Sequence, residues 1–297
     1  MEFHQLRYFL AVADEGNFTR AAAKSFVSQP SLSAQIIKLE EELGQKLFDR
    51  LGRRAELTDA GRFLERRARR ILMEVENAQL EIGEAASEVK GKVRVGFTPS
   101  IGSYIIPEVI AICRDRYPEL EIEVEEALRN RLIEEVLEGN LELALSSYSG
   151  GSPHLDVEPI LQEDLRLVLP REHPLVSKER ISIKDFKDEP LIALGEANTV
   201  GEKLVELFGR NEVEPKIIGY CSQLNTVKAL VHQGVGLSIL PEMSEEEHSP
   251  YDIVFRPLIS ERMMRLVFLM TNNRRYLPAG ARAFIETLRD YVDSREW

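Results

Sequence analysis

The sequence has few residues of the kinds that build disulfide or metal frameworks. It contains two cysteines, Cys113 and Cys221, and no CxxC pair, which excludes a disulfide scaffold. Its five histidines show no metal-ligand spacing, so we expect neither a metal nor a cofactor. No apolar run approaches the roughly 18 residues of a membrane helix. The N-terminus also lacks the basic, apolar and small-residue segments of a signal peptide, so we expect a cytoplasmic protein.

The distribution of charge separates the N-terminal part from the remainder of the chain. The net charge of -12 argues at first against a nucleic-acid partner. Residues 1–72, however, hold 13 basic and 10 acidic side chains, whereas the rest holds 25 basic and 40 acidic ones. Because an acidic body repels phosphate, any contact with DNA must come from the N-terminal part.

Apolar spacing predicts three short helices at the N-terminus. The first shows steps of 3 and 4 between apolar residues and ends at Gly16. We expect Thr19 to cap the second helix and Ser28 to cap the third, which Gly44 ends. The apolar face of the third helix carries Leu32, Ile36, Leu39 and Leu43.

A longer helix is predicted to open at Thr58 or Asp59 and to end at Gly91. Its apolar positions recur every 3.5 residues, the period of a coiled-coil seam. Such a stripe would be exposed in a monomer, so we expect it to mediate dimerisation. The positions are Leu64, Ala68, Ile71, Val75, Ala78, Ile82, Ala85 and Val89.

After Gly91, short apolar strands alternate with helical stretches. VRVGF, EIEVE, LALS, LRLVL, LIAL, KIIGY, GLSIL and RLVFLM are predicted strands. This alternation predicts an α/β domain with largely parallel sheets, which bind ligands at the carboxyl ends of their strands.

Residues 17–61 carry a motif series in order: AAA, SQPSLSAQI, LEEELGQKLFDR and LTDAG. The series closely resembles the N-terminal region of LysR-type transcriptional regulators. GNLELAL and HQGVGLSILP also fit, so the resemblance covers essentially the whole chain. It implies an all-α winged helix-turn-helix at 1–58 and a linker helix at 59–90. An α/β periplasmic-binding-protein-like domain of two Rossmann-like subdomains would follow at 91–297.

The resemblance further implies where the subdomains divide and how the protein assembles. Subdomain I would span about 91–162 plus 267–297, and subdomain II about 163–266. A homodimer or homotetramer is implied, and activation of transcription is common in the family. The effector would lie in the cleft between the subdomains.

The predicted recognition helix has the chemistry for reading base edges. Gln29 can pair with adenine, Ser33 can donate or accept, and Pro30 and Ala34 offer apolar contact. Basic side chains suit phosphate, and Arg53 suits a narrow minor groove. Two roles are open for Ile37, contact with DNA or packing against the first helix, and packing is favoured. The full predicted DNA-binding set is Thr19, Ser28, Gln29, Pro30, Ser31, Ser33, Ala34, Lys38, Arg50, Arg53 and Arg54.

Candidate effector residues follow the predicted strands. At Thr98, Pro99 and Ser100 a strand runs into a helix, whose free N–H groups suit a carboxylate or similar anion. The same hydroxyls and amides are also ordinary helix caps, an alternative that stays open. The other candidates are Ser146, Asn198, Thr199, Ser222 and Gln223.

The sequence therefore predicts a sequence-specific DNA-binding regulator controlled by a small-molecule effector. Three alternatives to this function remain. Peroxide-sensing members of the family use two cysteines about nine residues apart, where this chain has Thr199 and Phe208. Cys113 is expected in the core, and Cys221 as a small buried filler or a reactive thiol. The second alternative is a cytoplasmic solute-binding module, and the third is an α/β enzyme with no DNA role. The sequence shows no P-loop, nucleophile elbow or HExxH motif, so we expect no enzyme.

Overall fold

The computed structural model describes residues 1–51, 54–83, 89–147, 152–195, 199–246, 248–258 and 262–295. The chain divides into two compact units, Met1–Ala86 and Ser87–Trp297. Each unit has its own hydrophobic core, and each is described by itself. Among the helices of the described residues, none is both long and apolar enough to cross a membrane.

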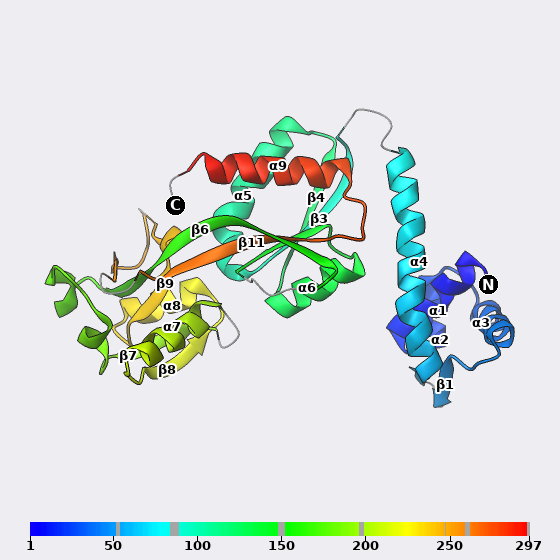
Figure 1. Ribbon diagram of the computed structural model, residues 1–297, viewed down its shortest axis with the longest axis horizontal. Helices are drawn as coiled ribbons and strands as arrows, with labels where there is room; N and C mark the ends of the chain where they lie inside the picture. The colour runs from blue at the N-terminus through cyan, green and yellow to red at the C-terminus, as the bar shows by residue number, and fades with distance from the viewer. Residues whose placement is uncertain are drawn as a thin grey trace. The chain divides into compact units, whose positions relative to one another are not determined.

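The N-terminal unit packs helices around one core and adds a two-stranded hairpin. Its helices are α1 (Phe3–Glu15), α2 (Phe18–Lys24), α3 (Gln29–Leu43) and α4 (Asp59–Gly83). Strands β1 (Phe48–Leu51) and β2 (Arg54–Leu57) follow α3 and precede α4 in the chain, and they pair antiparallel with each other (Figure 1). A helix-turn-helix followed by a hairpin is the predicted winged arrangement.

The caps of the short helices explain their boundaries, with one correction. Gly16 and Gly44 end α1 and α3 in the left-handed conformation, as predicted. Ser28 caps α3 by accepting a hydrogen bond from the Ser31 amide at 3.3 Å. The prediction that Thr19 caps α2 is wrong. Asn17 does so, because its side-chain oxygen accepts from the amides of Thr19 and Arg20.

Two motif residues hold the hairpin against the helices. Glu40 is buried on α3, and its Oε1 accepts from the amides of Leu47 and Phe48 at 2.8 and 3.3 Å. Thr58 caps α4 by accepting from the Gly61 amide, and its hydroxyl donates to the carbonyl oxygen of Lys46. These contacts give a structural reason for the LE and LTDAG parts of the motif.

The first half of the α4 stripe belongs to the chain's own core. Ala68 is fully buried, and Leu64 and Ile71 pack against the core that α1 helps to form. Further along the helix the stripe becomes exposed, and the side chain of Ile82 is 79% accessible. Val75, half-buried, and the exposed Ala78 lie between these two parts. Ala85 lies outside the described residues, and Val89 follows the helix rather than continuing it.

The second unit contains one long mixed sheet with helices on both faces. β3 (Gly91–Phe97) pairs parallel with β4 (Leu120–Glu126) and β5 (Leu143–Ser146). Helices α5 (Pro99–Arg116) and α9 (Ala279–Asp293) contact each other beside this sheet, and α6 (Arg129–Glu138) contacts β5 and β11 (Figure 1). Their core combines residues 93–161 with residues 267–292.

Two long antiparallel strands pass from this core to a second one. β6 (Leu155–Pro170) pairs with β11 (Met264–Asn272) through its first part. Its last part pairs with β9 (Ser238–Pro241) and β10 (Ile253–Arg256). The expectation of largely parallel sheets is therefore wrong, because both crossover strands pair antiparallel with each other and with their further neighbours.

The second core lies entirely between residues 165 and 263. Here β7 (Pro190–Leu194) pairs parallel with β8 (Lys216–Cys221), and a bridge from Leu191 to Leu237 leads toward β9. Helices α7 (Thr199–Arg210) and α8 (Leu224–His232) pack on these strands, with short turns η1 (Pro174–Ser177), η2 (Ile183–Phe186) and η3 (Glu242–Ser244) nearby. Two α/β halves joined by crossover strands are the fold class that the sequence predicted.

Candidate DNA interface and effector site

The N-terminal end of α3 presents a continuous exposed surface. Ser28, Gln29, Pro30 and Ser31 are all exposed, while Leu32 behind them is fully buried. The side-chain amide of Gln29 donates through its Nε2 to the Ser33 hydroxyl at 2.9 Å, which places two predicted base-reading side chains together. A helix-turn-helix uses this end of its second helix to meet base edges.

Exposed positive charge is also present on α3 and on the hairpin. Lys38 and Arg54 are exposed and have no ion-pair partner among the described residues, so their charges are available to phosphate. Arg50 lies on β1, with a side chain outside the described set, and Arg53 lies outside the described residues. Thr19 and Ala34 are exposed on α2 and α3.

Ile37 is exposed, contrary to the prediction that it packs inward. Its side chain is 37% accessible, whereas Ile36 beside it is fully buried. One step along a helix turns a residue by about 100°, so both cannot face the core that Ile36 fills. Ile37 thus belongs to the outer face of α3 that also carries Lys38.

In the second unit, the start of α5 contains a polar group that has no partner in the described part of the chain. Thr98 occupies the N-cap position but makes no capping bond with its side chain. Its hydroxyl oxygen is buried and has no hydrogen-bond partner among the described residues. Pro99 follows at the first helical position and has no N–H group, and the amides of Ile101 and Gly102 donate to the carbonyl oxygen of Thr98. A buried hydroxyl at the start of a helix can bind an anionic or carbonyl oxygen.

A buried arginine donates hydrogen bonds to Ser100. Arg265 on β11 donates to the Ser100 hydroxyl at 2.9 Å and to its carbonyl oxygen at 3.1 Å. The same guanidinium donates to the Ser147 hydroxyl at 3.4 Å, just beyond the end of β5. The base of α5 is therefore fixed to a crossover strand.

Glu163 on β6 balances the charge of Arg265. Its Oε1 lies 2.6 Å from the Arg265 Nε, and both side chains are fully buried. Its Oε2 accepts from the Met243 amide at 2.9 Å. Burial raises the pKa of Glu163 and lowers the pKa of Arg265, while the attraction between the two charges opposes both shifts.

A second polar link joins α5 to α8. Lys228 is almost fully buried, and its ammonium group lies 2.8 Å from Glu246 and 3.2 Å from the hydroxyl of Tyr104. Burial, and then the negative charge of Glu246, raise the pKa of Tyr104. Because Tyr104 also packs on the second core, this link connects the two halves of the unit.

The remaining predicted effector residues are less completely described. Ser146 is buried at the end of β5. Ser222 and Gln223 are exposed before α8, and Gln223 is its N-cap without a capping bond from its side chain. Asn198 lies outside the described residues, and Thr199 begins α7 with an undescribed side chain. The described contacts do not bring Ser222 or Gln223 to Thr98 or Ser100.

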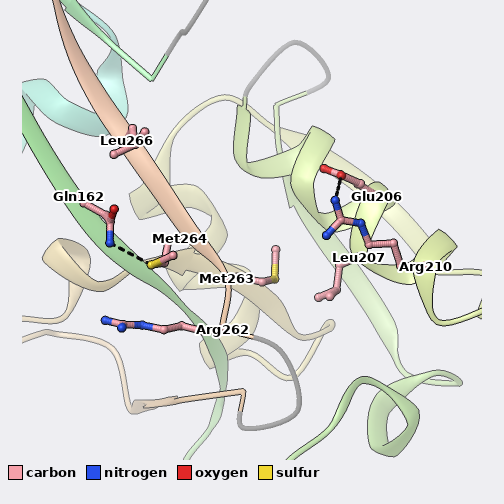
Figure 2. Close-up of a pocket in the computed structure, with 8 residues that line it drawn as sticks. All are labelled: Gln162, Glu206, Leu207, Arg210, Arg262, Met263, Met264 and Leu266. Atoms are coloured by element: carbon pink, nitrogen blue, oxygen red, sulfur yellow. Dashed lines mark hydrogen bonds and ion pairs between the residues drawn. The ribbon is translucent and has the colours of Figure 1, made fainter. Parts of the chain in front are cut away.

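The surface also has a pocket that includes none of the predicted effector residues. It has a volume of about 270 Å³ and lies between α7 and the crossover strands (Figure 2). Met263, Leu207 and Leu266 supply apolar lining. Gln162 donates to the Met264 sulfur, and Arg210 pairs with Glu206, as the dashed lines in Figure 2 show. Its charged groups are already paired, so it has no evident preference for an anion.

The sequence prediction missed the polar cluster beneath α5. Arg265 begins the predicted strand RLVFLM, and a charged residue within a buried strand was the available signal. Glu163 precedes the predicted strand LRLVL, so the prediction did not place it in a strand at all. Lys228 was likewise visible as a charge on the otherwise apolar side of α8. Glu163 and Arg265 are 102 residues apart in the chain, and Tyr104 and Lys228 are 124 apart, so spacing alone could not pair them.

A helix-turn-helix, a long helix and a two-lobed α/β unit together define a DNA-binding transcriptional regulator with an effector-binding domain. Residues 3–62 match the model of bacterial regulatory helix-turn-helix proteins of the lysR family. Residues 86–293 match the LysR substrate binding domain. The chain therefore belongs to the LysR family, whose members bind DNA and small-molecule effectors and form dimers or tetramers.

Individual relatives cover nearly the whole chain. The chain is 31% identical to the HTH-type transcriptional regulator AlsR of Bacillus subtilis, over 87% of this chain and 86% of AlsR. It is 27% identical to a hydrogen peroxide-inducible genes activator of Pectobacterium carotovorum, over 98% and 97% of the two chains.

Among solved structures, full-length OxyR from Pseudomonas aeruginosa, a point variant, is similar with a TM-score of 0.79 and 25% identity. That match covers 97% of this chain and 95% of OxyR. Full-length BenM is similar with a TM-score of 0.62 and 26% identity, over 99% and 97%. The predicted family and fold class are confirmed, and this family of regulators is not a class of enzymes.

Proposed function

We propose that this regulator acts in the cytoplasm without catalytic activity and responds to a small anion bound reversibly beside Thr98. The observation that carries the proposal is the buried Thr98 hydroxyl, which has no hydrogen-bond partner among the described residues. It lies at the start of an 18-residue helix, and the dipole of a helix favours negative charge at this end. A bound carboxylate would accept from this hydroxyl and so offset the cost of burying it unpaired.

The effector site is tested by the thermal stability of the full chain with a panel of small carboxylates. A carboxylate that binds the folded state raises the unfolding temperature, and the stabilisation grows with the logarithm of its concentration divided by Kd. Thr98→Val should abolish this rise and also stabilise the free protein by about 1 kcal/mol, because an unpaired buried hydroxyl is removed. Thr271→Val serves as a matched control. A carboxylate that stabilises the Thr98→Val variant as much as the wild type would contradict the proposed site.

DNA recognition is proposed to run through Gln29 and its neighbours at the start of α3. Fluorescence anisotropy with DNA from the upstream region of its own gene measures this binding across a salt series. We expect Gln29→Ala to reduce the preference for the specific site, since one bidentate base contact contributes about 1–3 kcal/mol. Gln45→Ala replaces another exposed glutamine of the same unit and should bind normally. Equal binding by Gln29→Ala would remove this residue from the interface.

The peroxide-related names of several relatives suggest a second candidate signal, but the thiols of this chain favour the first. Cys113 and Cys221 are both free, and Cys113 is fully buried. Phe208, at one position where peroxide sensors have cysteine, is a fully buried core residue here. We expect peroxide treatment to leave DNA binding unchanged. Mass spectrometry that finds a bond between the two cysteines, with altered binding, would favour the thiol-based signal instead.

A further inference from the structure

The turn between α2 and α3 carries a phenyl ring that packs against nothing. Phe26 is 95% exposed, far more than Phe3 at 54%. Its backbone is also unusual, since a φ of 55° is left-handed. That region is unfavourable for a residue with a side chain and favours glycine. Neither the packing nor the backbone therefore explains a phenylalanine here.

The turn is held in place without this side chain. The Phe26 amide donates to the carbonyl oxygen of Ala23 at 3.2 Å, and the Val27 amide donates to that of Ala22 at 3.0 Å. The side chain of Val27 packs on the core of the N-terminal unit. A glycine at position 26 would keep both backbone bonds and the Val27 contact.

The position of Phe26 points to DNA as the partner of its ring. It precedes the N-cap Ser28 by two residues and is followed by the exposed surface from Ser28 to Ser31. This end of the second helix is the part of a helix-turn-helix that meets base edges. In the major groove the apolar group on those edges is the 5-methyl of thymine, which phenylalanine can contact.

We propose that Phe26 is a specificity-determining residue that packs against the methyl group of a thymine at the edge of each half-site. The inference rests on the DNA-binding function of the family and adds a contact to the predicted set. Burying one methyl group contributes about a fourfold change in affinity for each half-site. A dimer engaging two half-sites would lose about fifteenfold when both rings are removed.

The experiment uses the full-length chain and a duplex that the wild type enriches from a random-sequence pool. Phe26→Gly should bind this duplex about fifteenfold more weakly, with an unfolding temperature equal to or above that of the wild type. Phe3→Ala removes a half-exposed ring from the same unit and should bind normally. Equal binding by Phe26→Gly and the wild type would overturn the proposal.

Uracil, which lacks the 5-methyl group, identifies the thymine. Each thymine of the duplex is replaced by uracil in turn, and both proteins are measured on every duplex. At one thymine in each half-site, a single replacement should weaken the wild type about fourfold, and replacing both of these thymines should weaken it about fifteenfold, as Phe26→Gly does. Neither replacement should weaken the variant further. If, at every thymine, uracil weakens binding by the same factor in the wild type and in Phe26→Gly, the proposed methyl contact is overturned. A wild type that enriches no sequence would instead contradict the DNA-binding function itself.

Discussion

Arg265 and Glu163 form an ion pair that has no access to solvent, with the guanidinium also bound to Ser100 and Ser147. Such a pair contributes little net stability compared with an apolar pair, because both charges lose their hydration. Its effect is geometric. It joins the two crossover strands to the helix start where the effector is proposed to bind.

Replacing one partner of this pair should be costly. Glu163→Gln leaves a buried guanidinium without a countercharge, so we expect the free energy of unfolding to fall by about 3–5 kcal/mol. Urea unfolding followed by circular dichroism measures the loss. The double variant Glu163→Leu with Arg265→Met removes both charges and should recover much of it. A Glu163→Gln protein as stable as the wild type would mean that Arg265 finds another partner.

The two thiols should differ in reactivity. Burial raises the pKa of the Cys113 thiol, so less of the reactive thiolate is present at any given pH than in an ordinary cysteine. We expect iodoacetamide to label the half-buried Cys221 first, and Cys113 only when the fold opens. Peptide mass spectrometry over a labelling time course from pH 7 to 9 checks this. Labelling of Cys113 at the rate of a free peptide would contradict its burial.

At the scale of elements, α3 and the hairpin depend on Glu40. Removing its carboxylate in Glu40→Ala leaves the buried amides of Leu47 and Phe48 without their acceptor. We expect a loss of about 3 kcal/mol in the stability of the N-terminal unit, at about 1–3 kcal/mol for each unpaired group. Hydrogen exchange resolved by peptide reports on that unit separately. Glu41→Ala, at an exposed neighbour, should leave exchange unchanged.

Helix α4 carries one apolar stripe, whose first part contacts the chain's own core and whose far part reaches the exposed Ile82. Because Leu64, Ala68 and Ile71 contact the chain's own core, we expect dimerisation to depend on Val75, Ala78 and Ile82. Ile82→Glu places a charge in this seam and should weaken the dimer about tenfold or more. Sedimentation over a micromolar concentration range measures the shift. Arg70→Glu, away from the stripe, should sediment like the wild type.

At the scale of the whole molecule, the acidic body confines DNA binding to the first unit. Each phosphate contact adds about 0.9 to the slope of log affinity against log salt concentration. We therefore expect Lys38→Ala to lower this slope by about 1 and to weaken binding to all sequences alike. Gln29→Ala should change sequence preference but leave the slope as it is. A slope unaffected by Lys38→Ala would show that this lysine does not contact phosphate.

Local patterns predicted the elements well because caps and apolar spacing act within a few residues. Ser28, Gly16 and Gly44 were found in this way, whereas Thr19 was chosen over Asn17, although asparagine is the better capping residue. Pairing direction was not predictable, since a buried strand has the same apolar pattern in parallel and antiparallel sheets. The ion pair of Glu163 and Arg265, and the link of Lys228 to Tyr104, depend on contacts that only the completed fold creates.

The crossover strands also impose an order on folding while the chain is being synthesised at the ribosome. The second core closes with residues that end at 263, whereas the first also needs β11 and α9, the last elements of the chain. A nascent chain thus completes its DNA-reading unit, then its inserted lobe, and last the lobe that begins at Gly91. Domains generally fold as they emerge, and synthesis adds about 5–20 residues per second. Several seconds therefore pass between the synthesis of β3, β4 and β5 and that of β11 and α9. The lobe that carries Thr98 is therefore the last to form, and the DNA reader is complete before the sensor that controls it.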